Sequence, residues 1–328
     1  MFDRSARATL LGLGFFGSAA LLLFCATGAR ADDQIRAGTP EPTAYVFSPV
    51  TVGIESGIFK KHGLEVERID FAGGAKLHQA MTAGALDVII GTGSDIPFVL
   101  KGAPERVVAA YGNDLNSVSL VVRSDNSVKT IADLRGRTVG TTAPGSFTTW
   151  VAKTILSNHG IPPDQFKLAH LGAMNGIIAG LLAKDVDAIV GTTAGSLALE
   201  REGKARILVK AGAEIHDFIA DVIYASEPMM KERPAVLRRF LAAWFDTLRF
   251  MKANKAETIR ITQPLTKLSD KIASEIYDAE TPSLFTDGHI DKKKLAAVQQ
   301  ALVDVGVIDK PAPEADFIDE RFLPQAGG

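Results

Sequence analysis

A repeating pattern of short β-branched runs, small polar loops and helix-length amphipathic segments constrains this fold most. The pattern begins at Asp32 and recurs along most of the chain. When a crossover helix follows a strand, the next strand lies parallel to the first one in the same sheet. The pattern therefore predicts an α/β fold with mainly parallel sheets.

The expected strands form two sets, which predicts two lobes. The first set lies at 34–37, 65–70, 87–90 and 106–110, and the second at 117–123, 138–141, 166–170, 187–190 and 206–210. A further run at 218–225 precedes a helical region. Helices are expected at 49–61, 76–83, 95–101, 147–159, 176–183, 234–253, 270–279 and 292–305.

This order predicts a chain that leaves the first lobe and later returns to it. We expect a first lobe over 32–116, a second over 117–216, and a return segment with the helical part of the first lobe over 217–328. The crossings are expected near 113–117 and 212–221. No Pro/Gly/Ser-rich linker separates the lobes, which favours short hinge segments.

Residues 1–31 have the pattern of a secretory signal peptide. Arg4 and Arg7 precede an apolar run over 9–24, and Ala29-Arg30-Ala31 forms a small-x-small cleavage site. Cleavage there would leave Asp32 first in the mature protein. A retained membrane anchor is the alternative, which the glycines within the run disfavour.

The single cysteine, Cys25, lies inside this predicted signal. The mature chain is therefore expected to have no disulfide, no thiol nucleophile and no thiolate metal ligand. Lipid attachment at Cys25 is the alternative, although Phe24 stands where a lipoprotein signal carries a small residue. The six histidines lack metal-ligand spacing, so neither a metal nor another cofactor is expected.

The charge of the chain argues against nucleic acid as a partner. The formal net charge is −2, and loss of Arg4, Arg7, Arg30 and Asp3 with the signal leaves −4. Nucleic-acid binders carry clustered basic patches, and the short run at 292–294 is better explained as a solvated helix face.

Four stretches resemble motifs of the nitrate/sulfonate/taurine periplasmic binding proteins, a family related to the pyrimidine-precursor proteins of thiamin metabolism. Glu55–Val66 resembles E-x-G-(F/I)-F-K-K-x-G-L-x-V, and Gly84–Val88 resembles A-G-x-(L/V)-D-(V/F). Ile131–Gly140 resembles (I/V)-x-D-L-K-G-K-x-V-G, and Leu181–Ala188 resembles A-L-x-x-G-x-(V/I)-D-A, with Asp185 in place of the glycine. All four occur in the family's order.

The resemblance implies a two-lobe type II periplasmic-binding-protein fold with a helical C-terminal region. It also implies a periplasmic, monomeric, non-catalytic protein that delivers a small solute to the permease of an ABC importer. A sulfonate, a nitrate-like anion or another small acid is the first expectation for the ligand, and a pyrimidine-type thiamin precursor is the second. An enzyme of the pyrimidine-synthase type and a sensor that presents its closed lobes to a receptor remain further alternatives.

The ligand is expected where strand ends lead into helix N-termini, because free backbone N–H groups gather there. The small or hydroxylated loops at such positions supply the first-lobe candidates Tyr45, Phe47, Ser48, Thr92 and Ser94. The second-lobe candidates are Thr142, Gly145, Ser146, Phe147, Asn175 and Thr192.

Several residues have a simpler structural interpretation. Ser48 and Ser146 suit helix N-caps, and Asp95 suits the first turn of a helix. If Asp95 faced the ligand, it would argue against a fully anionic one. Lys76 is expected in solvent, and His78 at the surface or at the lobe interface. Two aspartates, 87 and 187, stand at the entrance to buried strands, which favours a structural role for both.

Overall fold

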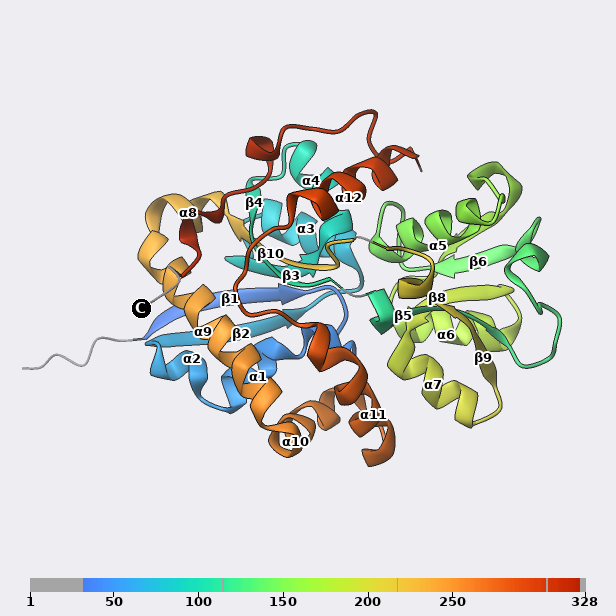
Figure 1. Cartoon of the computed structure of the whole chain (residues 1–328), viewed down its shortest axis with the longest axis horizontal. Helices are drawn as coiled ribbons and strands as arrows, with labels where there is room; N and C mark the ends of the chain where they lie inside the picture. The colour runs from blue at the N-terminus through green and yellow to red at the C-terminus, as the bar shows by residue number, and fades with distance from the viewer. Residues whose placement is uncertain (1–31, 114, 217, 305, 325–328) are drawn as a thin grey trace, which may run out of the picture. The chain divides into compact units, whose positions relative to one another are not determined.

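The computed structural model describes residues 32–113, 115–216, 218–304 and 306–324. The predicted signal peptide and Cys25 lie outside these ranges. Within them, the chain forms two five-stranded sheets with helices on their faces (Figure 1). No helix of this described part is both long and apolar enough to span a membrane.

The first sheet is mixed rather than fully parallel. In spatial order its strands are β2 (Leu64–Asp70), β1 (Asp33–Thr39), β3 (Val88–Thr92), β10 (Asp221–Ser226) and β4 (Glu105–Gly112). β1 runs parallel to β2 and β3, whereas β10 is antiparallel to β3 and β4. The antiparallel strand is the one that returns from the other sheet.

The second sheet repeats this arrangement. In spatial order its strands are β7 (Lys167–His170), β6 (Thr138–Thr141), β8 (Ala188–Thr192), β5 (Val118–Arg123) and β9 (Ala205–Lys210). β5 is antiparallel to β8 and β9 and takes the place that β10 has in the first sheet. The chain passes from the first sheet to the second between β4 and β5, and returns between β9 and β10.

Both faces of the first sheet are buried, and successive side chains along a strand point to opposite faces. In β3, Val88 and Ile90 join one hydrophobic cluster and Ile89 joins another. The first cluster packs the sheet against α1 (Pro49–Glu55), α2 (Ile58–Lys61) and α9 (Pro234–Ala253). The second packs it against α3 (Gly74–Thr82) and α4 (Ile96–Leu100) and continues into α12 (Lys292–Asp304).

The second sheet is covered by helices from its own crossovers. α5 (Phe147–Asn158) contributes to the second cluster, and α6 (Met174–Ala183) packs on the opposite face. α7 (Thr193–Arg201) lies along β9 and β5. The remaining helices are α8 (Glu227–Glu232), α10 (Lys255–Thr266) and α11 (Asp270–Glu280).

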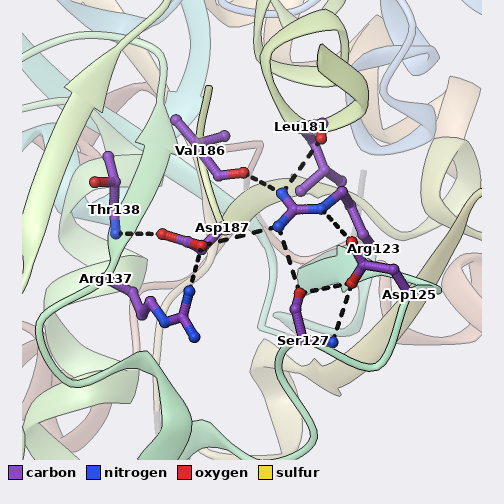
Figure 2. A network of polar contacts seen from close by, with 8 residues as sticks. All are labelled: Arg123, Asp125, Ser127, Arg137, Thr138, Leu181, Val186 and Asp187. Atoms are coloured by element: carbon purple, nitrogen blue, oxygen red, sulfur yellow. Dashed lines mark hydrogen bonds and ion pairs between the residues drawn. The ribbon is translucent and has the colours of Figure 1, made fainter. Parts of the chain in front are cut away.

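A polar network ties strands of the second sheet together at one end (Figure 2). Asp187 Oδ2 accepts the backbone N–H of Thr138 at 3.0 Å, and Asp187 Oδ1 accepts from the Arg137 guanidinium at 3.1 Å. Arg123 lies between this carboxylate and that of Asp125, to which its Nε donates at 2.9 Å. Asp187 is therefore structural, as the sequence indicated.

The expected helix over 49–61 is wrong as a single element. It breaks after Ser56, because Gly57 adopts a left-handed conformation with φ of 71° before α2 begins. The sequence also did not predict α7, α8 or α10; α10 contains Pro264, which ordinarily marks a helix boundary.

Candidate ligand-binding site

A cavity of about 60 Å³ lies where loops of the two sheets meet. This volume has room for roughly four to six water molecules, so its size suits a small solute. Its lining is mostly apolar, with hydroxyls and carboxylates at a few points. It is formed by Pro40, Glu41, Ala44, Val46, Phe47, Gly73, Gly74, Thr92, Asp95, Leu115, Ser117, Val118, Thr142, Phe147, Thr148, Met174, Gly191, Thr192 and Asp221.

The loop after β3 brings a carboxylate to the cavity. Thr92 and Asp95 form a capping box, in which Asp95 Oδ2 accepts the Thr92 hydroxyl at 2.8 Å and the Thr92 N–H at 3.3 Å. The Ser94 hydroxyl bonds to Thr92 at 2.9 Å and does not line the cavity. Asp95 Oδ1 is buried and has no hydrogen-bond partner among the described residues.

His78 lies behind Asp95, which corrects the expectation of a surface or lobe-interface histidine. Its ring is 1 % exposed, stacks on Phe98, and meets Tyr224 edge-on. Nδ1 is 2.6 Å from Glu105 Oε1, and Nε2 is 3.6 Å from Asp95 Oδ2. Burial by itself lowers the pKa of His78, but the two carboxylates outweigh it and raise the pKa to about 9.

The loop between β6 and α5 holds a cluster of hydroxyls. Thr148 Oγ1 accepts the backbone N–H of Thr142 at 2.9 Å, and both threonines line the cavity. Ser146 is the N-cap residue by position, but its side chain makes no capping bond to α5. It accepts instead from the Thr142 hydroxyl at 2.7 Å and the Ala143 N–H at 3.3 Å.

Gly145 and Ser146 thus lie beside the cavity rather than in its lining. Gly145 is exposed with φ of 70°, and a side chain there would contact nothing within 4 Å. Close approach of a ligand to its backbone stays a prediction. The glycine that faces the opposite lobe closely is Gly73, where a Cβ would lie 3.0 Å from Thr142 Oγ1.

Of the aromatic candidates, Phe47 and Phe147 line the cavity. Tyr45 is buried behind it, where its hydroxyl bonds to Thr281 at 2.7 Å. Ser48 precedes α1 but makes no side-chain cap, and its hydroxyl is buried without a partner among the described residues. Ser48 is the N-cap residue of α1 by position, as predicted, but without a capping bond from its side chain.

In the second lobe, Thr192 lines the cavity and caps α7 by accepting the N–H of Gly195 at 3.2 Å. Its neighbour Thr193 donates to the Asn116 carbonyl at 2.6 Å. Asn175 is exposed and does not line the cavity, where the preceding Met174 lies instead. Contact of any of these side chains with a ligand stays a prediction.

Among the described residues that line the cavity, all charged side chains are carboxylates. Glu41, Asp95 and Asp221 line the cavity, and no lysine, arginine or histidine does so among the described residues. Glu41 accepts the N–H and hydroxyl of Thr43 at 3.1 and 2.8 Å, and burial raises its pKa. The sequence analysis missed Glu41 and Asp221, although Glu41 lies only two residues after the end of the first strand. Within the described ranges, no group of side chains is arranged to hold a metal ion.

Comparison with known proteins places the chain in a family. The model of the family described as NMT1/THI5 like matches residues 44–258, more than half of the chain. The chain belongs to this family. A Brucella abortus relative named provisionally as a binding protein is 22% identical over 291 residues, covering 82% of this chain and 85% of the relative. A Haemophilus influenzae relative, named provisionally as a thiamine biosynthesis protein, is 28% identical over 215 residues, covering 63% and 66%.

Solved structures show that the chain shares its fold with periplasmic binding proteins. A Bordetella bronchiseptica protein is 26% identical with a TM-score of 0.77, covering 88% of this chain and 95% of its own. The alkanesulfonate-binding protein SsuA of Xanthomonas axonopodis, bound to MOPS, is 17% identical with a TM-score of 0.73, covering 89% and 94%. The desulfurization enzyme DszB is also similar, at 17% identity and a TM-score of 0.64, covering 88% and 97%.

The expected α/β two-lobe binding-protein fold with a helical C-terminal region is therefore confirmed. The names of the relatives favour a binding role over a catalytic one. The fold alone does not distinguish the two roles, because the enzyme DszB has a similar structure.

Proposed function

We propose that this chain is an exported solute-binding protein, working as a periplasmic monomer that delivers a small organic solute to an ABC importer. The observation that carries the proposal is the cavity, because strand ends and helix starts of both sheets contribute to its wall. A solute held there would contact both lobes at once, which couples binding to closure about the two crossing segments.

The wall of the cavity also bears on the class of solute. Thr142, Thr148 and Thr192 offer hydroxyls, and the side chains of Phe47 and Phe147 offer apolar contact. A sulfonate or nitrate-like anion finds no basic side chain in the described lining and meets three carboxylates. A planar heterocycle such as a pyrimidine fits this wall better, in line with the name of the Haemophilus influenzae relative.

A catalytic role has less support in this chain. The only cysteine, Cys25, lies in the predicted signal peptide. The described lining offers no histidine or lysine as a base for its threonine hydroxyls. We propose that the protein releases its solute unchanged.

Native mass spectrometry of the protein purified from its own host tests the proposal. A small solute should accompany the intact protein, leave on denaturation, and keep its mass after prolonged incubation with fresh protein. Conversion to a new product would contradict the binding role. Retention of no solute, together with no thermal stabilisation by any small organic compound tested, would also contradict it.

A further inference from the structure

A buried charged cluster stands behind one wall of the cavity. The side chains of Asp95, His78 and Glu105 are each 1 % exposed or less. His78 lies between the two carboxylates, 2.6 Å from Glu105 and 3.6 Å from Asp95. With the ring protonated and both carboxyls ionised, the cluster carries one uncompensated negative charge. Such a charge is costly to bury unless another positive group approaches it.

Two carboxylate oxygens of the cluster, Asp95 Oδ1 and Glu105 Oε2, have no hydrogen-bond partner among the described residues. Of these two residues only Asp95 lines the cavity, and its other oxygen, Oδ2, accepts from Thr92 and faces His78. Oδ1 lies beside Gly74 of the cavity lining, where a Cβ would come within 2.8 Å of it. The glycine keeps this side of the carboxylate clear. An oxygen of a cavity-lining residue that has unused acceptor capacity is suited to a ligand N–H.

The rest of the wall supports the same polarity. Glu41 and Asp221 add two further carboxylates to the lining, and none of the basic side chains in the described ranges lines the cavity. Lys76, the lysine nearest in sequence to Gly74, is exposed and does not line the cavity. An anion would therefore enter a field of like charge, whereas a cation would be attracted.

We propose that the solute carries a cationic nitrogen group, such as an ammonium, amidinium or guanidinium, whose N–H groups bind Asp95 Oδ1. The proposal rests on the proposed function and names the chemical class of its ligand. It assigns Asp95 as the residue that selects a cation over a neutral or anionic solute of similar size.

Thermal melting against three pools of small organic compounds tests this selection. One pool holds ammonium, amidinium and guanidinium compounds, the second their neutral alcohol and amide counterparts, and the third sulfonates and carboxylates of matched size. We expect only the first pool to raise the Tm. Stabilisation by the neutral or the anionic pool alone would overturn the cation assignment and leave the solute-binding role intact. Stabilisation by no pool would count against both.

Asp95→Asn then tests the residue, with calorimetry on the best compound of the first pool. The loss of charge should weaken binding at least about tenfold, because a charge-assisted hydrogen bond becomes neutral. Asp133→Asn is the matched control: Asp133 forms the same kind of capping box with Thr130, but it does not line the cavity. It should leave affinity unchanged.

Two results would overturn the assignment of Asp95. One is equal affinity of Asp95→Asn and wild type for the cation. The other is tighter binding of a sulfonate than of its ammonium counterpart by wild type. Both variants are first compared with wild type by melting without compound, so that a folding defect is not mistaken for lost affinity.

Discussion

Asp87 and Asp187 occupy equivalent positions in the two sheets, each directly before a fully buried strand. Asp87 Oδ2 accepts the N–H of Arg36 at 2.8 Å, and Asp187 Oδ2 accepts that of Thr138 at 3.0 Å. The backbone N–H of each aspartate donates back to the carbonyl of the same partner, at 2.9 and 2.8 Å. Each pair fixes the start of one inner strand against its parallel neighbour.

Removal of either carboxylate should therefore destabilise the fold by a similar amount. Asp87→Ala and Asp187→Ala each leave a backbone N–H and an arginine without their acceptor, which should lower the free energy of unfolding by about 1–3 kcal/mol. Urea unfolding measures the change. Asp185→Ala is the control, because Asp185 is exposed two residues away. A loss at Asp185 as large as that at Asp187 would contradict the structural role.

The buried histidine predicts a pH-dependent stability. The pKa of His78 is raised to about 9 in the folded protein, against about 6.5 for an exposed histidine. The charged ring therefore stabilises the fold fully below about pH 6.5, and this contribution disappears as the pH rises through about 9. His78→Gln should cost more stability at pH 6 than at pH 9.5, with a difference on the order of 3 kcal/mol.

Chemical unfolding at the two pH values measures that difference. His159→Gln is the control, since its partly exposed ring pairs with Glu214 at the surface. The control should change little between the two pH values, as surface pairs contribute about 0–1 kcal/mol. An equal cost of His78→Gln at both values would show that folding does not raise the pKa of the ring.

Local sequence patterns predicted most of the fold, because strands and long amphipathic helices follow from periodicity. Thr138–Thr141 and Pro234–Ala253 have the predicted bounds. α7 was missed because its first turn, Thr193-Ala194-Gly195-Ser196, is a run of small residues typical of a loop. β5 and β10 each lie antiparallel to their neighbours because of how the chain crosses between the two sheets. Hydrophobic periodicity along the sequence carries no information about that crossing.

The site could be predicted only in part, because its charges come from segments far apart in the sequence. The loops holding Thr92, Thr142 and Thr192 were predicted from their places after strands, and all three line the cavity. The burial of His78 in α3 was not predicted, since its partner Glu105 lies 27 residues away, at the start of strand β4. Asp221 comes to the cavity only through the return strand β10.

The cavity wall predicts a contribution of Phe47 to affinity. Phe47→Leu should weaken binding of the retained solute by about 1 kcal/mol, or roughly fivefold, because ring contact is lost. Calorimetry measures the change. Phe166→Leu is the matched control, because Phe166 is equally buried but does not line the cavity. An equal loss of affinity in both variants would mean that general destabilisation explains the effect.

The amino terminus predicts export and cleavage. Arg4, Arg7, the apolar run over 9–24 and the site ending at Ala31 should direct the chain across the membrane and yield a mature protein that begins at Asp32. Amino-terminal sequencing of periplasmic material measures this. Lipid on Cys25, or an intact leader in that material, would contradict it.

We expect substitutions in the loop between β6 and α5 to change ligand affinity and the free energy of unfolding to different degrees. Thr148→Val removes the hydroxyl of a residue that lines the cavity, so affinity should fall by about 1–2 kcal/mol, or roughly five- to thirtyfold. Because the same hydroxyl accepts the Thr142 N–H, this variant should also lose about 1 kcal/mol of stability. Ser146→Ala removes the acceptor of the Ala143 N–H from a buried position beside the cavity. It should lower the free energy of unfolding by about 1 kcal/mol and change affinity less than Thr148→Val does.

Two further variants of this loop and its helix complete the comparison. Gly145→Val should cost about 1–2 kcal/mol of stability through its left-handed backbone, since a side chain there meets no neighbour. Thr154→Val is the control within α5, because the Thr154 hydroxyl is buried without a hydrogen-bond partner among the described residues and does not line the cavity. Calorimetry gives the affinities, and thermal melting without ligand gives the stabilities. If Ser146→Ala lowers affinity more than Thr148→Val does, the solute contacts Ser146 directly, and the loop must rearrange on binding to expose it.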